Sequence, residues 1–314
     1  MVLVLAACAQ VGERAPEPGP VEAVQPGSPW AETKRQVLDA VNRARRQAGL
    51  PPVAWDRVLE RTGDAFCERL VAESAVGHVV ADGVPPYLRY VLAGGDGFHR
   101  QNVGSLDSTA EVDTAQLGDI ALALLDEMLA EQPPNDGHRE TILDPFATHL
   151  GVGVAAAGGA VRVSHEFAAR RVVDWRPPPP SARPLTVLRL EGAVAPPLEV
   201  AAVEVLWQPL PTERHADAGP VRAYGYPPSR ALFAASGHGS SRPAAGTVET
   251  LSTGTRSRFS FSWRTGAAEG VELLVVWAGS RRTGARLEPV GLAATVVTTA
   301  GSLPPPLAAW AELR

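Results

Sequence analysis

The stretch PPNDGHRETILDP, residues 133–145, and the apolar run LGVGVAAAGGAVRVSHEF at 150–167 decide how the first half of the chain folds. In the first, two prolines and an Asn-Asp-Gly turn precede a short helical segment that Asp144-Pro145 ends. In the second, two apolar-rich strands flank Gly158-Gly159, which predicts a β-hairpin. His138 therefore stands at the start of a short helix. It either lines a binding cleft or is a turn residue beside the helix opening, and the sequence leaves both interpretations open.

Upstream of this stretch, apolar residues recur at helical spacing in three segments. Ser28-Pro29 suits the opening of the first helix, with serine as the cap and proline at the first helical position, and Gly49 ends it. Asp56 is suited to cap a second helix, which is expected to run to about Gly77-His78. A third helix is predicted from about Ala115 to Glu131.

The proline run RPPPPSARP at 176–184 favours an extended spacer and separates two halves of different character. From about 185 to 300 no helical pattern is evident, and short apolar segments such as VRAYGY at 221–226 alternate with Gly, Pro and Ser. FSFSW at 259–263 places its aromatic residues on one face of a strand. We therefore predict an all-β sandwich of immunoglobulin type, with SGHGS at 236–240 as a loop. Together the two halves give an α+β chain.

The composition bounds the partners and the cellular location. A net charge of -5 provides no basic footprint, so we expect no nucleic acid partner. The N-terminus MVLVLAACAQ resembles a bacterial lipoprotein signal in which Cys8 becomes the lipidated residue, and the proline-rich stretch behind it has the composition of a tether. The alternative is an ordinary short apolar N-terminus. Cys67 lies in a helical pattern and is expected to be a core residue.

Three pieces of the first half resemble the CAP superfamily, the SCP-like extracellular domain, in its bacterial form. They are VLDAVNRARRQAGLPPVAWDRVLERTGDAF at 37–66, the segment ending in Gly77-His78, and Gly137-His138-Arg139 followed by LGVGVA and a strand ending in Glu166-Phe167. The resemblance covers about residues 33–168. It implies an α-β-α sandwich with a central antiparallel sheet and a surface cleft.

The resemblance also implies a set of cleft residues. In many members two histidines and two acidic residues line the cleft, and in some they hold a divalent metal such as zinc. Carried over to this sequence, the histidines are His78 and His138, and one acidic residue is Glu131. These three residues are the expected metal ligands, and imidazole and carboxylate suit zinc.

At the fourth cleft position the chain departs from the family pattern. The segment Arg100-Gln101-Asn102-Val103 places Gln101 where a glutamate is expected. An amide brings no negative charge, so metal binding should be weaker, and a Gln101→Glu variant is expected to strengthen it. His99 or His165 could substitute as a ligand, although neither is at the family position. His165 alternates with apolar residues, which favours a core or edge histidine with a satisfied hydrogen bond over a ligand role.

Three functions follow from these features. The first is a non-enzymatic, surface-anchored protein that binds a small ligand, lipid or envelope component. The second is a metal-dependent hydrolase acting on peptide or cell-wall material, although no Gly-x-Ser-x-Gly, HExxH or paired-cysteine motif identifies catalytic residues. The third is a structural envelope protein with a vestigial cleft. The predicted organisation is a lipoprotein-type signal (1–8), a tether (9–28), a CAP-like domain (29–175), a linker (176–184), a β-sandwich domain (185–303) and a tail (304–314).

Overall fold

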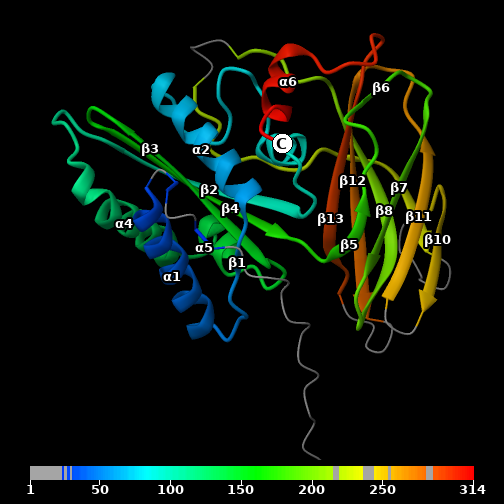
Figure 1. Cartoon of the computed structure of the whole chain (residues 1–314), viewed down its shortest axis with the longest axis horizontal. Coiled ribbons are helices and arrows are strands. Elements are labelled where there is room, and N and C mark those ends of the chain that lie inside the picture. Colours follow the sequence, from blue (N-terminus) through cyan, green and yellow to red (C-terminus); the bar gives the residue numbers. More distant parts are fainter. Residues whose placement is uncertain are drawn as a thin grey trace, which may run out of the picture.

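The structure is a computed structural model that describes residues 23–24, 27–28, 30–214, 219–235, 244–253, 256–280 and 286–314. Cys8, the rest of the predicted signal, most of the tether and the SGHGS loop lie outside these residues. The described chain forms a mixed helix and sheet region followed by a β-rich region (Figure 1). No helix within these ranges is long and apolar enough to cross a membrane.

The first helix, α1 (Ala31–Gln47), lies where the apolar spacing predicts it and ends before Gly49. The predicted serine cap is wrong. The helix begins after Trp30, which takes a left-handed backbone conformation (φ 58°) and makes no side-chain capping bond. Ser28 contributes its backbone carbonyl instead, which accepts a hydrogen bond from the Ala31 N–H at 3.2 Å.

The second helix, α2 (Arg57–Ala72), is capped as predicted, because Asp56 Oδ1 accepts a hydrogen bond from the Leu59 N–H at 2.8 Å. It ends several residues before the predicted Gly77-His78. The physical reason is Ser74, whose left-handed backbone conformation (φ 50°) cannot continue a helix. The residues from there to His78 are therefore free to reach a neighbouring element.

The remaining helices of this region differ in how visible they are in the sequence. The predicted third helix is α4 (Leu117–Ala130), preceded by the 3₁₀ turn η1 (Thr114–Gln116), and the short helix after the Asn-Asp-Gly turn is α5 (Gly137–Ile142). The sequence did not predict α3 (Pro86–Leu92). Every residue of α3 is buried, so no polar face gives it a helical period.

The first sheet has four strands in the order β1-β3-β4-β2. Strands β3 (His149–Ala157) and β4 (Ala160–Ala169) form the predicted hairpin, and β1 (Ala54–Trp55) pairs parallel with β3. Strand β2 (Phe98–Asp107) pairs antiparallel with β4 and has no further strand on its other side within the described sheet. The backbone groups along one side of β2 therefore need other partners.

Helices cover both faces of this sheet (Figure 1). Val152, Val163 and Phe167 pack in one apolar cluster with residues of α1 and α4. On the opposite face α2 approaches β3 very closely, because a Cβ atom at Gly153 would lie 2.1 Å from the carbonyl carbon of Gly63. The predicted mixed helix and sheet architecture is confirmed.

The β-rich region forms one continuous set of nine strands in the order β5-β7-β11-β10-β9-β8-β12-β13-β6. The set folds back on itself, since Leu190 and Phe261 on one part share an apolar cluster with Val203 and Leu274 on the other. The strands are β5 (Val172–Arg176), β6 (Ser181–Ala182), β7 (Val187–Val194), β8 (Leu198–Gln208), β9 (Ser229–Ala235), β10 (Gly246–Thr253), β11 (Arg256–Arg264), β12 (Gly270–Ser280) and β13 (Glu288–Val297). The proline run lies between β5 and β6, which both pair within this set.

Two segments of the second half differ from the sequence-based expectation. VRAYGY at 221–226 forms no strand, so that prediction is wrong; it lies between β8 and β9 and contacts the first region instead. The tail contains a further helix, α6 (Pro305–Ala311), whose Trp310 Nε1 donates to Asp82 at 2.7 Å. Both segments are held by contacts with the first region that a local pattern does not encode.

The two regions share one apolar core. Leu59 and Phe66 of α2 belong to the same buried cluster as Leu206 of β8, Leu273 of β12 and Trp310 of α6. Figure 1 shows α6 between the helices of the first region and the strands of the second. The β-rich region is therefore packed against the first region through buried side chains.

Candidate functional site

The four cleft residues expected from the sequence meet along the free side of β2. His78, Gln101, Glu131 and His138 all line one cleft of about 630 Å³, called here the β2 cleft. Gln101 is on β2 and His138 is on α5, while His78 follows α2 and approaches from the other face of the sheet. Asn102 joins β2 to α5, because its Nδ2 donates to the His138 carbonyl at 2.9 Å. The neighbouring positions Gln101 and Asn102 of the edge strand β2 thus connect residues that lie on opposite faces of the sheet.

Gln101 is the centre of a buried hydrogen-bonded chain. Its Nε2 donates to Glu166 Oε1 at 2.7 Å, and its Oε1 lies 2.9 Å from His78 Nδ1. A carboxylate only accepts, which fixes the amide nitrogen toward Glu166 and the amide oxygen toward His78. His78 Nδ1 must therefore carry the proton, and Nε2 is the nitrogen left for the β2 cleft.

Glu166 supplies the negative charge that position 101 lacks. It lies on β4 directly opposite Gln101, and its second oxygen accepts a hydrogen bond from His99 Nε2 at 2.8 Å. Burial acts to raise the pKa of Glu166, but the hydrogen bond and charge of His99 and the Gln101 amide together lower it below its usual value. The sequence comparison placed Glu166 at the end of a strand motif but assigned it no role in the cleft.

The charge state of His78 follows from its surroundings. Burial lowers the pKa of His78, and the hydrogen bond with Gln101 offsets this only in part, while the charges of Arg89 and His138 lower it further. Two guanidinium nitrogens of Arg89 also bond to the His78 carbonyl, at 3.1 and 3.2 Å. At neutral pH His78 is thus an uncharged imidazole with an unprotonated Nε2.

His138 is oriented by Glu131. Its Nδ1 lies 2.5 Å from Glu131 Oε1, and its backbone N–H donates to Glu131 Oε2 at 2.9 Å. Burial would raise the pKa of Glu131, but these bonds and the charge of His138 lower it. Glu131 therefore acts as an orienting group for His138 and the start of α5, and again Nε2 is the ring nitrogen left for a ligand.

Residues 219–228 of the β-rich region, called here the tyrosine segment, form a wall of the β2 cleft. The His78 N–H donates to the Val221 carbonyl at 2.8 Å, and a Cβ atom at Gly77 would lie 2.5 Å from that carbonyl oxygen. Gly77 also has φ +93°, so only glycine suits this position. Arg222 and Tyr224 line the cleft from this side.

The tyrosines of this segment complete the free side of β2. The Gln101 N–H donates to the Tyr224 hydroxyl oxygen at 2.7 Å. The Tyr226 hydroxyl donates to the His99 carbonyl at 2.8 Å and accepts from the His99 N–H at 3.2 Å. Phenol groups thus take the place of an additional strand, and Tyr226 is further held by stacking on Phe98 at 4.5 Å between ring centroids.

The residues present do not fit the metal site that the resemblance implies. Both oxygens of Glu131 already accept bonds from His138, and the Gln101 oxygen already faces His78 Nδ1. Within the described residues no group of three or more His, Cys, Asp and Glu side chains is placed to hold a metal ion. What remains is a pair of imidazole Nε2 atoms, short of a three-ligand protein site.

His165 is buried on the sheet face away from the Gln101 chain. Neither ring nitrogen has a hydrogen-bond partner among the described residues, so the expected satisfied hydrogen bond is wrong. Asn102, directly opposite on β2, donates its side-chain amide to the His138 carbonyl instead. Burial lowers the pKa of His165 to about 4. Cys67 is a buried free thiol, as expected.

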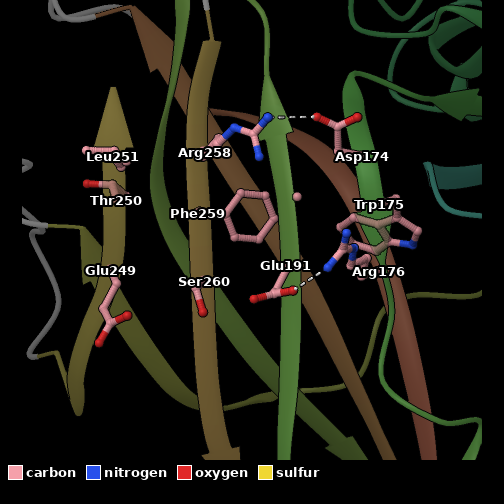
Figure 2. Close-up of a pocket in the computed structure, with 11 residues that line it drawn as sticks. Asp174, Trp175, Arg176, Glu191, Glu249, Thr250, Leu251, Arg258, Phe259 and Ser260 are labelled. Atoms are coloured by element: carbon pink, nitrogen blue, oxygen red, sulfur yellow. Dashed lines mark ion pairs between the residues drawn. The ribbon is translucent and has the colours of Figure 1, made fainter. Parts of the chain in front are cut away.

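A second hollow of about 660 Å³ lies on the outer part of the β-rich region (Figure 2). Figure 2 shows two pairs of charged side chains facing one another across strands: Arg258 pairs with Asp174 at 3.7 Å and Arg176 with Glu191 at 3.5 Å. These groups satisfy each other on an exposed sheet surface. The β2 cleft, with its buried and oriented polar groups, is therefore the better candidate site.

Comparison with known proteins places the first region in a family. Residues 38–165 match the family model described as CAP, the cysteine-rich secretory protein family. Solved structures similar to the chain include an extracellular protein containing a SCP domain from Bacillus anthracis (20% identity, 44% of this chain, 41% of that chain, TM-score 0.35). Another is an outer surface protein of Borrelia burgdorferi (13% identity, 45% of this chain, 94% of that chain, TM-score 0.35). A third is the CAP domain of enterococcal PrgA (13% identity, 44% of this chain, 60% of that chain, TM-score 0.35). The chain thus spans less than half of the Bacillus protein. No curated protein matches the chain.

Proposed function

Residues 38–165 form a CAP domain, and from this premise we propose that the chain is an extracytoplasmic, non-enzymatic protein that binds a small polar ligand in the β2 cleft. One observation carries the proposal. The Nδ1 atoms of His78 and His138 are both bonded to protein partners, which leaves two Nε2 atoms for the same cleft. Such fixed, convergent polar groups are typical of ligand sites.

The volume of the β2 cleft supports binding over a vestigial role. A structural protein with a vestigial cleft would be favoured if His99 and Arg100 filled it. Instead His99 is fully buried against Glu166, and Arg100 lines the rim, about 44% exposed, with Asp144 at 3.6 Å. A space of about 630 Å³ is within the range of small-molecule sites.

The experiment is a thermal-shift titration with the low-molecular-mass fraction of a bacterial cell-envelope extract. We expect the extract to raise the Tm of the wild-type protein, because a ligand that binds the native state stabilises it. A His78→Ala/His138→Ala variant should lose this increase. His149→Ala is the matched control, since His149 is partly exposed and is not among the cleft residues. No increase for the wild type, or an equal increase for the double variant, would contradict the proposal.

A metal-dependent hydrolase is the alternative that the same protein sample tests. The donor set gives it little support, since Glu131 is engaged by His138. The binding of zinc can be measured by calorimetry. If wild type bound one zinc ion tightly and the double histidine variant did not, the hydrolase would replace our proposal. Zinc-dependent cleavage of a peptide or cell-wall substrate would do the same.

The proposed location rests on the N-terminal sequence. We propose that Cys8 carries a lipid that anchors the protein to the outer face of a membrane. Metabolic labelling with a fatty-acid probe should mark the wild type and not a Cys8→Ser variant, and equal labelling of both would refute the anchor. The immunoglobulin-type topology of the β-rich region likewise stays a prediction.

A further inference from the structure

We propose that Tyr224 of the β-rich region contacts the ligand of the β2 cleft and selects for a neutral saccharide; this inference rests on the proposed function. The starting observation is the position of its ring. The centroids of Tyr224 and His78 are 4.9 Å apart, with the rings inclined at 59°. An imidazole and a phenol therefore form adjacent walls of the same cleft, although they are 146 positions apart in the sequence.

The hydroxyl of Tyr224 has one half of its hydrogen bonding unused. Its oxygen accepts from the Gln101 N–H at 2.7 Å, and its proton has no acceptor among the described residues. Tyr226 shows the contrast, since its hydroxyl both donates to and accepts from the backbone of His99. The cleft wall thus offers a donor at Tyr224 beside the acceptor Nε2 of His78.

The charges of the cleft lining favour an uncharged partner. Arg100 and Arg222 contribute two positive charges, and Glu131 and Glu140 contribute two negative charges. The arginine and carboxylate charges of the lining therefore balance, apart from His138, which is paired with Glu131. Hydroxyl groups suit this lining, because each one donates to an acceptor such as an imidazole nitrogen and accepts from a donor such as a phenol at the same time.

A saccharide combines these features. Neighbouring hydroxyls on a sugar ring are close enough to reach His78 and Tyr224 together, and the apolar C–H face of the ring packs on an aromatic side chain. A ligand without hydroxyls would leave the Tyr224 donor and the His78 Nε2 acceptor unpaired in a partly buried site, which costs binding free energy.

The test uses the full chain and three neutral disaccharides, cellobiose, maltose and N,N′-diacetylchitobiose. A digalacturonate of similar size is the charged probe. Binding is followed by calorimetry and by the ring resonances of His78 in NMR spectra. We expect at least one neutral disaccharide to bind and to shift these resonances, with digalacturonate at least tenfold weaker.

Tyr224→Phe should weaken binding of that disaccharide about tenfold, which is the effect of one lost hydrogen bond. Tyr87→Phe is the matched control. Its hydroxyl donates to Gln208 at 2.6 Å between the two regions and does not line the cleft. It should lower the Tm and leave the affinity within twofold of wild type.

The outcomes separate this inference from the proposed function. If the envelope extract stabilises wild type but no neutral disaccharide binds, or if Tyr224→Phe binds as tightly as wild type, the saccharide inference is wrong and the proposed binding function stands. If digalacturonate binds as well as the neutral disaccharides, the selection for an uncharged ligand is wrong. If the extract has no effect, the proposed function itself fails.

Discussion

Replacing Gln101 by glutamate introduces a carboxylate beside Glu166, and the structure predicts how the protein responds to pH. The Gln101 Nε2 and Glu166 Oε1 atoms are 2.7 Å apart, and both side chains are buried. Two carboxylates at such a separation cannot both be ionised, so one of them retains a proton. The resemblance to metal-binding relatives had suggested tighter metal binding for this variant. We now expect a proton to be taken up instead.

The sign and size of the effect follow from linkage. The pKa of the carboxyl pair in folded Gln101→Glu lies above that of an unfolded glutamate, so its contribution to stability is present at low pH and is lost as the pH rises through the raised value. A rise of two pKa units corresponds to roughly 3 kcal/mol. We therefore expect Gln101→Glu to be about 3 kcal/mol less stable than wild type at pH 8, with a much smaller difference at pH 5.

Urea unfolding followed by tryptophan fluorescence from pH 5 to pH 8 measures this difference. Gln101→Glu/Glu166→Gln is the decisive control, because it exchanges the amide and the carboxylate and keeps a single negative charge between positions 101 and 166. The exchanged variant should regain most of the lost stability at pH 8. Two results would contradict the hydrogen bond between Gln101 and Glu166: equal destabilisation of Gln101→Glu at pH 5 and pH 8, or a stability of the exchanged variant at pH 8 no higher than that of Gln101→Glu.

Three further substitutions test the packing around the cleft, each by urea unfolding. Wild type should lose up to about 3 kcal/mol of stability between pH 7 and pH 4, because the pKa of His165 in the folded protein, about 4, lies below that of an unfolded histidine, so unfolding takes up a proton. His165→Leu should remove this pH-dependent loss, and an unchanged pH dependence in the variant would refute the prediction. Asp56→Ala should cost about 2 kcal/mol at pH 7, since it removes the cap of α2 at Leu59, and a loss under 0.5 kcal/mol would show that the cap is dispensable. Gly153→Ala should cost at least about 3 kcal/mol through a backbone clash with Gly63; near-wild-type stability would mean that α2 can move away.

The sequence predicted elements whose signals are local. The cap at Asp56, the hairpin around Gly158-Gly159 and the helix after the Asn-Asp-Gly turn all depend on residues within a few positions of one another. The family resemblance brought His78 and His138 to one cleft. Their convergence required the fold, because no local pattern relates a segment after α2 to the start of α5.

The features that were missed depend on long-range contacts. Strand pairing places Glu166 opposite Gln101, and this register is not visible when positions are compared one at a time. VRAYGY at 221–226 has a strand-like composition, yet Tyr224 and Tyr226 bond to the backbone of β2 through their hydroxyls. A segment with two tyrosines and a glycine between them gave no signal that its partner was an edge strand in another region.

These two findings change how the amide at position 101 is understood. A glutamine in place of a glutamate suggested a cleft that had lost a charge. In the fold the charge is retained one strand away at Glu166, and the amide transmits its effect by fixing the proton of His78 on Nδ1. The same residue also donates its backbone N–H to Tyr224, so one position links the orientation of the imidazole to the wall supplied by the β-rich region. Loss of the Gln101 side chain should therefore disturb the proton position of His78 while the backbone bond to Tyr224 remains, whereas loss of the Tyr224 hydroxyl should leave the protonation of His78 unchanged.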